Sequence, residues 1–457
     1  MNSIILSALW GVLMMYTGVV SRSNKAPGIM AALGAVLLMG AAWLDLNGVS
    51  LAPFDLHGML EFPPYVSGFI LLMSLCLLLY VLLSNDEIDR LTGHSADYLA
   101  LIFFVMTGVI IVASFKTLLM MFLGVEIMSI PLYILAASDK RNLKSNEAGL
   151  KYFLMGSFST GIMLMGIALL YGSFGTFYTA ALNIGFLALS PLTLAGIVLL
   201  MVSMAFKVSA APFHFWTPDV YDGTPSVFTS FMATIVKAAA FFGFLRLFEG
   251  AFGKLHEHWQ ILTAIITAAT LLIGNLTAVF QQSVKRMLAY SSIAQAGFMM
   301  FALFAMNATA RQGLVLYGVS YSLATIGVFA VLAKMKDQTF VGFNGLATHK
   351  PFLALMLTVF LLSLAGIPLT AGFFAKYYML LAALKTGQML WLVILAVLSA
   401  AVGIYYYFRV IQAMYFKEGA DQEVETSSGF RATLLVTAVI IILLGVHPDW
   451  VIALVNY

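Results

Sequence analysis

The stretch MAFKVSAAPFHFWTPD, Met204–Asp219, interrupts an apolar run that extends over residues 191–222. A helix crosses the hydrocarbon core of a bilayer with about 20 residues, so this run is too long for one simple crossing. It contains Pro212 and Pro218, and proline removes a backbone donor and breaks the helix. Inside a membrane, broken backbone is tolerated only where protein buries it or where it lines a wet cavity. The stretch therefore predicts a broken membrane helix at a functional cavity, with Lys207 at the break.

The rest of the chain has the same apolar character, with 62% hydrophobic and 9% charged residues. A soluble protein is nearer half apolar and a quarter charged. We therefore expect an all-α polytopic membrane protein with about 14 transmembrane helices and almost no soluble domain. The predicted spans are 3–20, 28–45, 65–84, 97–114, 115–137, 148–172, 191–222, 225–249, 258–281, 284–306, 311–334, 352–384, 389–416 and 431–454.

Several chemistries are excluded by what the sequence lacks. Cys76 is the single cysteine, so no disulfide framework or iron–sulfur site can be built from this chain. None of the seven histidines falls near the middle of an apolar span, which argues against a membrane haem. We find no Walker A motif and no Gly-x-Gly-x-x-Gly loop after a strand. The chain has no visible means of carrying electrons or binding a nucleotide by itself.

The basic residues predict the orientation. Most of them follow the odd-numbered spans, as in Lys140–Lys144 and Lys334–Lys350, whereas the loops after even-numbered spans carry few. The positive-inside rule then places the odd loops in the cytoplasm and both termini on the outer face.

A second span, 352–384, is also too long and contains Pro368. It is the twelfth and the first broken span is the seventh, so the two cross in opposite directions, as in an inverted repeat with its pathway at the broken helices. We predict two inverted five-helix repeats with broken helices 7 and 12. The expected divisions are an N-terminal three-helix segment (1–96), a first repeat (97–249), a second, inverted repeat (258–416) and a last helix (431–457).

Charges inside the predicted spans identify the candidate site. A charge at mid-membrane costs at least ~2.5–3.5 kcal/mol, so it is a functional candidate by default. Glu126, Lys207, Lys237 and Lys376 all lie well inside apolar spans. A lysine in a low-dielectric site gives up its proton more readily than one in water, and a nearby glutamate reverses this effect. We interpret the four residues as a proton-transfer network.

A purely structural interpretation stays open for each of these residues. Glu126 and Lys207 can equally form a structural ion pair inside the bundle. Lys151 lies at the start of the sixth span, where snorkelling to the interface explains it as well as proton transfer does. His214 is either a proton relay, since histidine titrates near neutral pH, or part of the packing at the helix break. Hydroxyl and amide groups of the tenth span, Tyr290–Gln295, are candidates for links between the charges.

The sequence resembles the antiporter-like subunits of respiratory complex I. The resemblance covers nearly the whole chain and is carried by the mid-membrane glutamate, the lysines and two segments, 211–225 (APFHFWTPDVYDGTP) and 282–297 (QSVKRMLAYSSIAQAG). The residues of segment 211–225 resemble those of subunit N. Subunit M carries a glutamate where this chain has Lys376, and subunit L continues into a long lateral helix whereas this chain stops at Tyr457. Both differences favour subunit N.

The resemblance implies a role for each candidate. Glu126 with Lys207 would be the controlling ion pair, Lys237 the central relay and Lys376 the terminal site toward the outside. Lys151 matches a family lysine that joins the network. The implied activity is proton translocation as part of an NADH:quinone oxidoreductase in a bacterial inner membrane.

The resemblance also implies the partners. NADH, FMN, iron–sulfur clusters and quinone would belong to other subunits, with none of them on this chain, and the neighbours would be membrane subunits such as M, K and J. No nucleic acid is expected. The alternatives are an Mrp-type sodium/proton antiporter subunit, a membrane-bound hydrogenase subunit, or a structural membrane spacer whose buried charges only fix the packing.

Overall fold

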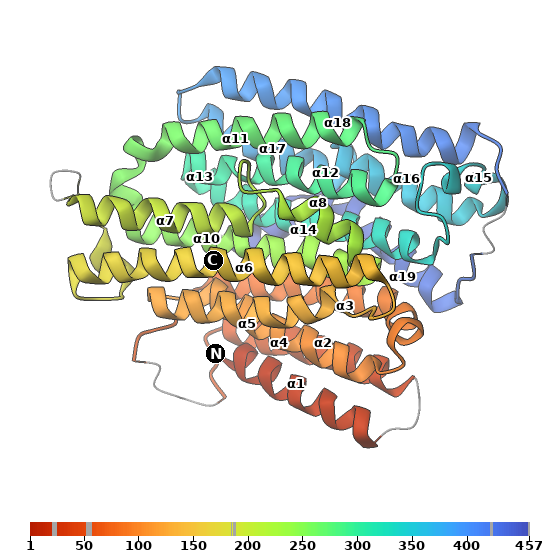
Figure 1. Ribbon diagram of the computed structural model, residues 1–457, viewed down its shortest axis with the longest axis horizontal. Coiled ribbons are helices and arrows are strands. Elements are labelled where there is room, and N and C mark those ends of the chain that lie inside the picture. The colour runs from red at the N-terminus through yellow and green to blue at the C-terminus, as the bar shows by residue number, and fades with distance from the viewer. Residues whose placement is uncertain (21–24, 52–56, 184, 186–188, 421–423, 456–457) are drawn as a thin grey trace.

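The computed structural model describes residues 1–20, 25–51, 57–183, 185, 189–420 and 424–455. Within these ranges the chain is helical and has no strand, apart from three isolated bridges between loop residues. The expected all-α fold is confirmed. Figure 1 shows long helices that run roughly parallel, with α1 and α2 at one edge of the molecule and α18 at the other.

The helices that make up the spans are α1 (Asn2–Val20), α2 (Ala26–Leu46), α3 (Pro64–Thr92), α4 (Ser95–Ser114), α5 (Leu118–Ala136), α6 (Leu143–Phe174), α7 (Pro191–Lys207), α8 (Trp216–Gly223), α9 (Ser226–Phe231), η3 (Met232–Val236), α10 (Lys237–Phe252), α11 (His256–Val279), α12 (Val284–Met299), α13 (Phe301–Ala305), α14 (Ala308–Lys334), α16 (Pro351–Ala365), α17 (Ala371–Leu384), α18 (Leu390–Phe416), α19 (Ser428–Val446) and α20 (Asp449–Val455). The short elements η1 (Thr179–Leu182), η4 (Gly253–Leu255), η5 (Val341–Phe343) and α15 (Leu346–His349) lie in the connections.

The predicted spans correspond to these helices. Eleven helical segments of the described chain are long and apolar enough to cross a membrane, and one of them, Ser226–Val279, contains two predicted spans. The remaining apolar helices, α7, α16 and α17, are shorter, because they are halves of the two spans that were expected to be broken. The chain is therefore a multi-pass membrane protein.

Both breaks lie where the prolines predicted them. Helix α7 ends at Lys207, and α8 begins only at Trp216. Helix α16 ends at Ala365, and α17 begins at Ala371. Gly366 caps α16 with a φ of 83°, in the left-handed region that glycine adopts without strain. Each break leaves helix-end carbonyl groups in the interior, where they need hydrogen-bond donors.

Helix α14 is the centre of the bundle. Its apolar window is completely buried, and it packs against α3, α9, α10, α16, α17 and α19. It therefore touches the second broken span directly, through α16 and α17, and the first through its neighbour α9, and Figure 1 shows it in the middle of the molecule.

The loops that follow five of the odd-numbered spans meet at one end of the bundle. A single cavity there is lined by Leu91, Asp139, Gly223, Ser283 and Thr339, which follow the third, fifth, seventh, ninth and eleventh spans. Which side of the membrane this end faces, and the division into repeats at 97–249 and 258–416, stay predictions.

Candidate functional site: a buried lysine relay

Lys237 is almost completely buried, with 2% exposure, at the point where η3 gives way to α10. Its ammonium group donates to Ser292 Oγ at 2.6 Å and to Ser292 O at 3.1 Å. The preceding segment, η3, is π-helical, and π-helical turns occur frequently at functional sites. Tyr321 of α14 also donates to Ser292 Oγ, at 2.9 Å. Lys237 therefore lies among neutral oxygen atoms, with α12 and α14 as its neighbours.

Gln295 lies one turn after Ser292 on α12 and connects this helix to α16. Its Nε2 donates to Leu364 O at 3.0 Å and to Tyr407 OH at 3.0 Å, and its Oε1 accepts a hydrogen bond from Tyr317 OH. Ser291 is hydrogen-bonded to Tyr407 as well. All of these side chains are buried. They form a polar cluster inside an otherwise apolar region.

Lys376 completes the line. Its Nζ donates to Leu364 O at 3.0 Å and to Ala365 O at 2.8 Å, the last two carbonyls of α16. The negative end of a helix stabilises a cation placed there. A Cβ on Gly366 would lie 2.8 Å from Lys376 Cδ, so the glycine also makes room for this lysine. Since Leu364 O accepts from both Gln295 and Lys376, a chain of hydrogen bonds joins the α12 cluster to the terminal lysine.

Lys207 at the end of α7 is hydrogen-bonded to α5, the helix that carries Glu126. The Lys207 ammonium group donates to Ser129 Oγ, and Ser129 in turn donates to Val125 O. Glu126 lies three residues before Ser129, on the same face of α5. Glu126 Oε1 is buried and has no hydrogen-bond partner within the described residues. Lys207 thus bonds to the serine, and no ion pair between Lys207 and Glu126 is seen among the described residues.

Aromatic rings lie between Lys207 and Lys237. The ring of Phe206 stacks on Trp216 at 5.5 Å, and Trp216 meets Tyr221 edge-on at 5.9 Å. The ammonium group of Lys237 lies 5.7 Å from the centroid of Tyr221. No hydrogen-bonded route between the two lysines is seen within the described part of the chain.

Lys151 and His214 lie apart from this line. Lys151 is 39% exposed and pairs with Glu147 at 2.7 Å and with Asp219 at 2.9 Å. Asp219 also pairs with Arg286 at 3.0 Å, so this cluster joins α6, α8 and α12 near the surface. His214 lies buried in the break between α7 and α8 and stacks on Phe215, and its Nδ1 has no partner among the described residues.

Sequence reasoning missed four participants: Ser129, Tyr317, Tyr321 and Tyr407. Tyr407 belongs to a run of three tyrosines, Tyr405–Tyr407, in an apolar span, and such a run could have signalled a buried polar function. Of the expected links on α12, Ser291, Ser292 and Gln295 are in the cluster, whereas Tyr290 is only partly buried and makes none of these contacts.

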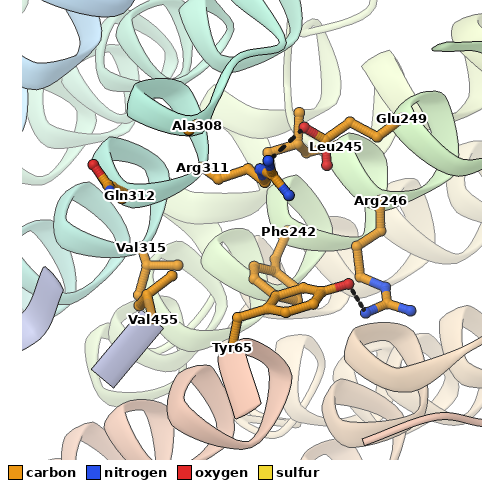
Figure 2. A pocket seen from close by; sticks show the side chains of 10 residues that line it. All are labelled: Tyr65, Phe242, Leu245, Arg246, Glu249, Ala308, Arg311, Gln312, Val315 and Val455. Atoms are coloured by element: carbon orange, nitrogen blue, oxygen red, sulfur yellow. Dashed lines mark hydrogen bonds and ion pairs between the residues drawn. The ribbon is translucent and has the colours of Figure 1, made fainter. Parts of the chain in front are cut away.

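Polar cavities lie near the two ends of α14. At its beginning, a cavity of about 260 Å³ is lined by Arg246, Glu249 and Arg311, with Tyr65 accepting a hydrogen bond from Arg246 at 2.7 Å (Figure 2). At its end, a cavity of about 450 Å³ is lined by charged and hydroxyl groups, Ala333 among its walls. Ala333 lies 22 residues after Arg311 on this helix, a rise of roughly 33 Å, which is about the thickness of a hydrocarbon core.

Fold and site together define a polytopic membrane protein that carries a line of buried lysines between two polar ends. Within the described residues no group of three or more histidine, cysteine, aspartate or glutamate side chains is placed to hold a metal ion.

Comparison with known proteins agrees with this class. The family described as NADH:quinone oxidoreductase/Mrp antiporter, TM, matches residues 114–403. NADH-quinone oxidoreductase subunit N of Cytophaga hutchinsonii is 38% identical over 455 residues, which are 98% of this chain and 98% of that protein. A chain of respiratory complex I from Thermus thermophilus with bound aureothin superposes with a TM-score of 0.84 at 32% identity, covering 99% of this chain and 98% of the other.

A chain of the Mrp complex from Dietzia has the same fold, with a TM-score of 0.87 over 99% of this chain and 96% of its own length, at 18% identity. The chain therefore belongs to the NADH:quinone oxidoreductase/Mrp antiporter membrane family, and within it to the group of NADH-quinone oxidoreductase N subunits. The resemblance drawn from the sequence is confirmed.

Proposed function

We propose that this chain is the proton-translocating membrane subunit N of an NADH:quinone oxidoreductase, and that the buried residues carry the protons. The observation that supports this most strongly is that α12 carries two neighbouring hydrogen-bonded groups: Ser292 with Lys237, and the Gln295 cluster, whose acceptor Leu364 O also binds Lys376. Each lysine is held by neutral oxygen atoms, so it can change its charge without leaving a carboxylate unpaired.

In this proposal Lys237 is the central proton carrier and Lys376 the terminal one. Lys207, with Ser129 and Glu126, is the control site, because a change in the distance between the carboxylate and the ammonium group alters the cost of a positive charge there. Lys151 belongs to the ion-pair cluster near the surface, where it fixes α8 through Asp219. His214 is a proton relay at the helix break. These roles follow from position and from the family.

The energy comes from partner subunits in this proposal. NADH, FMN, iron–sulfur clusters and quinone belong to them, and the chain lies in a bacterial inner membrane beside other membrane subunits, with its odd-numbered loops in the cytoplasm. Moving one charge against 100 mV costs about 2.3 kcal/mol, and this chain supplies no fuel-binding site of its own by its sequence.

The test is NADH-driven acidification of membrane vesicles, measured beside NADH:quinone activity, for the wild type and for Lys237→Ala after assembly of the complex has been verified. We expect both activities to fall together. Wild-type levels of both in the variant would make Lys237 structural and the chain a membrane spacer. Sodium-dependent exchange by this chain without NADH would favour an Mrp-type antiporter instead.

A further inference from the structure

We propose that Lys285 is a further proton-carrying residue: it takes up protons from the cavity at the end of α14 and passes them along buried hydroxyl groups to Lys237. This inference rests on the proposed function and adds the entry side to it. We call that cavity the vestibule; its polar lining includes Glu87, Asp139, Lys144, Asp222, Ser226 and Lys285.

Like the two relay lysines, Lys285 is buried and donates to neutral oxygen atoms, but it also has two charged neighbours, Asp222 and Lys144. It is 7% exposed, and its Nζ donates to Asp222 O at 2.8 Å and to Thr224 O at 2.6 Å. No carboxylate forms an ion pair with it within the described chain, and the Asp222 carboxylate lies 3.9 Å from Arg286 instead. A neutral amine still has two N–H groups for these two carbonyls and a lone pair left over. The site therefore fits both protonation states.

Lys334, a second buried lysine at the same end of the bundle, differs from Lys285 in having a carboxylate partner. Lys334 is held by Glu87 at 2.9 Å, and its side chain is 4% exposed. A buried ammonium group paired with a carboxylate is the arrangement of a structural ion pair. Lys334 therefore has the surroundings of a structural lysine, whereas Lys285 has those of a residue that exchanges its proton.

Three helix faces lead from the vestibule to Lys237. On α12, Lys285 and Ser292 are seven residues apart, which is two turns on one face and about 10 Å. On α9, Ser226 borders the vestibule, and Ser230 lies one turn deeper, seven residues before Lys237. The third face belongs to α14.

On α14, Ala333 borders the vestibule, and Ser322 lies eleven residues, about three turns, before it on the same face. Ser322 is next to Tyr321, which donates to Ser292 Oγ, the acceptor of the Lys237 hydrogen bond. Helix α14 packs against α9 and η3. The α12 and α14 faces meet at Ser292 Oγ, to which both Lys237 and Tyr321 donate.

Hydroxyl groups without partners mark this route. Thr224 Oγ1, Ser230 Oγ and Ser322 Oγ are buried and have no hydrogen-bond partner among the described residues. Buried polar groups are nearly always paired, so these three unpaired hydroxyls, which we call the hydroxyl row, call for an explanation. A hydroxyl can accept a proton on its oxygen while it gives up its own, so a row of them with internal water molecules transfers a proton without a net change in any member.

The step is balanced as follows. The neutral Lys285 amine binds a proton from the vestibule and becomes an ammonium group. It then releases a proton to the hydroxyl row, whose far end protonates the neutral Lys237 amine, and Lys285 returns to its neutral form.

The test compares Lys285→Arg with Lys285→Met in the assembled complex, by NADH-driven acidification and NADH:quinone activity. An arginine keeps the positive charge and can donate to both carbonyls, but it does not release its proton. If Lys285 only neutralises the end of α8, the arginine variant pumps like the wild type, which would overturn the inference. If Lys285 carries protons, both variants lose pumping by about 100-fold, the low end of the range for loss of a proton-transfer group.

Two further variants complete the design. Lys144→Ala removes an exposed lysine of the same cavity and is expected to leave pumping unchanged; a loss equal to that of Lys285→Arg would mean that only the field of the vestibule matters, against the inference. Ser230→Ala removes one hydroxyl of the row and is expected to reduce pumping less than Lys285→Met. Wild-type pumping in Ser230→Ala would overturn the route, even if Lys285→Arg failed to assemble. Lys237→Ala separates the two proposals, because normal pumping there would refute the proposed function itself.

Discussion

Replacing Gln295 with methionine should disconnect the two relay lysines while leaving the bundle almost intact. The amide now holds Leu364 O, Tyr407 OH and Tyr317 OH. After the substitution Leu364 O keeps Lys376 as a donor, and Tyr407 keeps Ser291. Only the hydroxyl of Tyr317 loses its partner, and one unpaired buried polar group costs about 1–3 kcal/mol.

The matched control is Asn275→Leu. Asn275 Oδ1 accepts a hydrogen bond from Tyr406 OH at 3.1 Å, so this change also leaves one buried tyrosine hydroxyl without its amide acceptor. Asn275 makes no hydrogen bond to Lys237, Lys376 or their immediate partners within the described residues. Both variants should therefore lower the unfolding temperature of the purified complex to a similar degree.

The pumping assay separates the two variants. We expect NADH-driven acidification to fall by about tenfold or more in Gln295→Met, because the lesion removes a proton-transfer link, and to remain near the wild-type level in Asn275→Leu. Equal pumping in the two variants, at equal stability, would refute the reasoning that the Gln295 cluster joins Lys237 to Lys376.

Three other substitutions test parts of the site. Lys376→Met should abolish pumping in an assembled complex, and acidification at the wild-type rate would remove this lysine from the path. Gly366→Ala should lower the unfolding temperature and reduce pumping together, because a Cβ strains a backbone with a φ of 83° and displaces Lys376; separate thermal and pumping measurements that show neither effect would contradict this. Lys151→Met should change the free energy of unfolding by less than about 1 kcal/mol, since its ion pairs are well exposed, and a larger loss in a denaturation experiment would show a tighter cluster at α8.

The sequence was sufficient to predict the fold because a long apolar segment in a membrane can adopt few kinds of backbone structure. Apolar runs of about 20 residues must be helices, since only a helix satisfies all its backbone groups in lipid. The two breaks followed from run length and from Pro212 and Pro368, and both are present. The basic residues predicted that the loops after the odd-numbered spans lie at the same end of the bundle, and residues that follow five of these spans line one cavity.

The site could be predicted only as a set of charges. Glu126, Lys207, Lys237 and Lys376 stand out because charge is rare in apolar spans, but the sequence does not say what each one touches. Contacts made by Ser129 and Tyr407 depend on helix packing and on rotation about each axis. The π-helical turn before Lys237 changes that rotation, and nothing in its residues, Met232–Val236, distinguishes it from ordinary helix.

Lys285 was overlooked for a different reason. It lies at the start of its span, where sequence reasoning counts a lysine as a loop charge that sets topology. Only the packing of α8 over it shows that its ammonium group is buried against two carbonyls. Position along a span is therefore a poor guide to burial near helix ends.

The central claim is that protons pass through Lys237, and Lys237→Gln tests it most directly. The glutamine amide can still donate to Ser292 but cannot carry a proton at any physiological pH. The measurement is the rate of proton movement and the rate of NADH oxidation by the purified complex in sealed vesicles, together with the ratio of the two rates. The account predicts a loss of proton movement together with quinone reduction in an assembled complex. An unchanged ratio at an unchanged rate would contradict it.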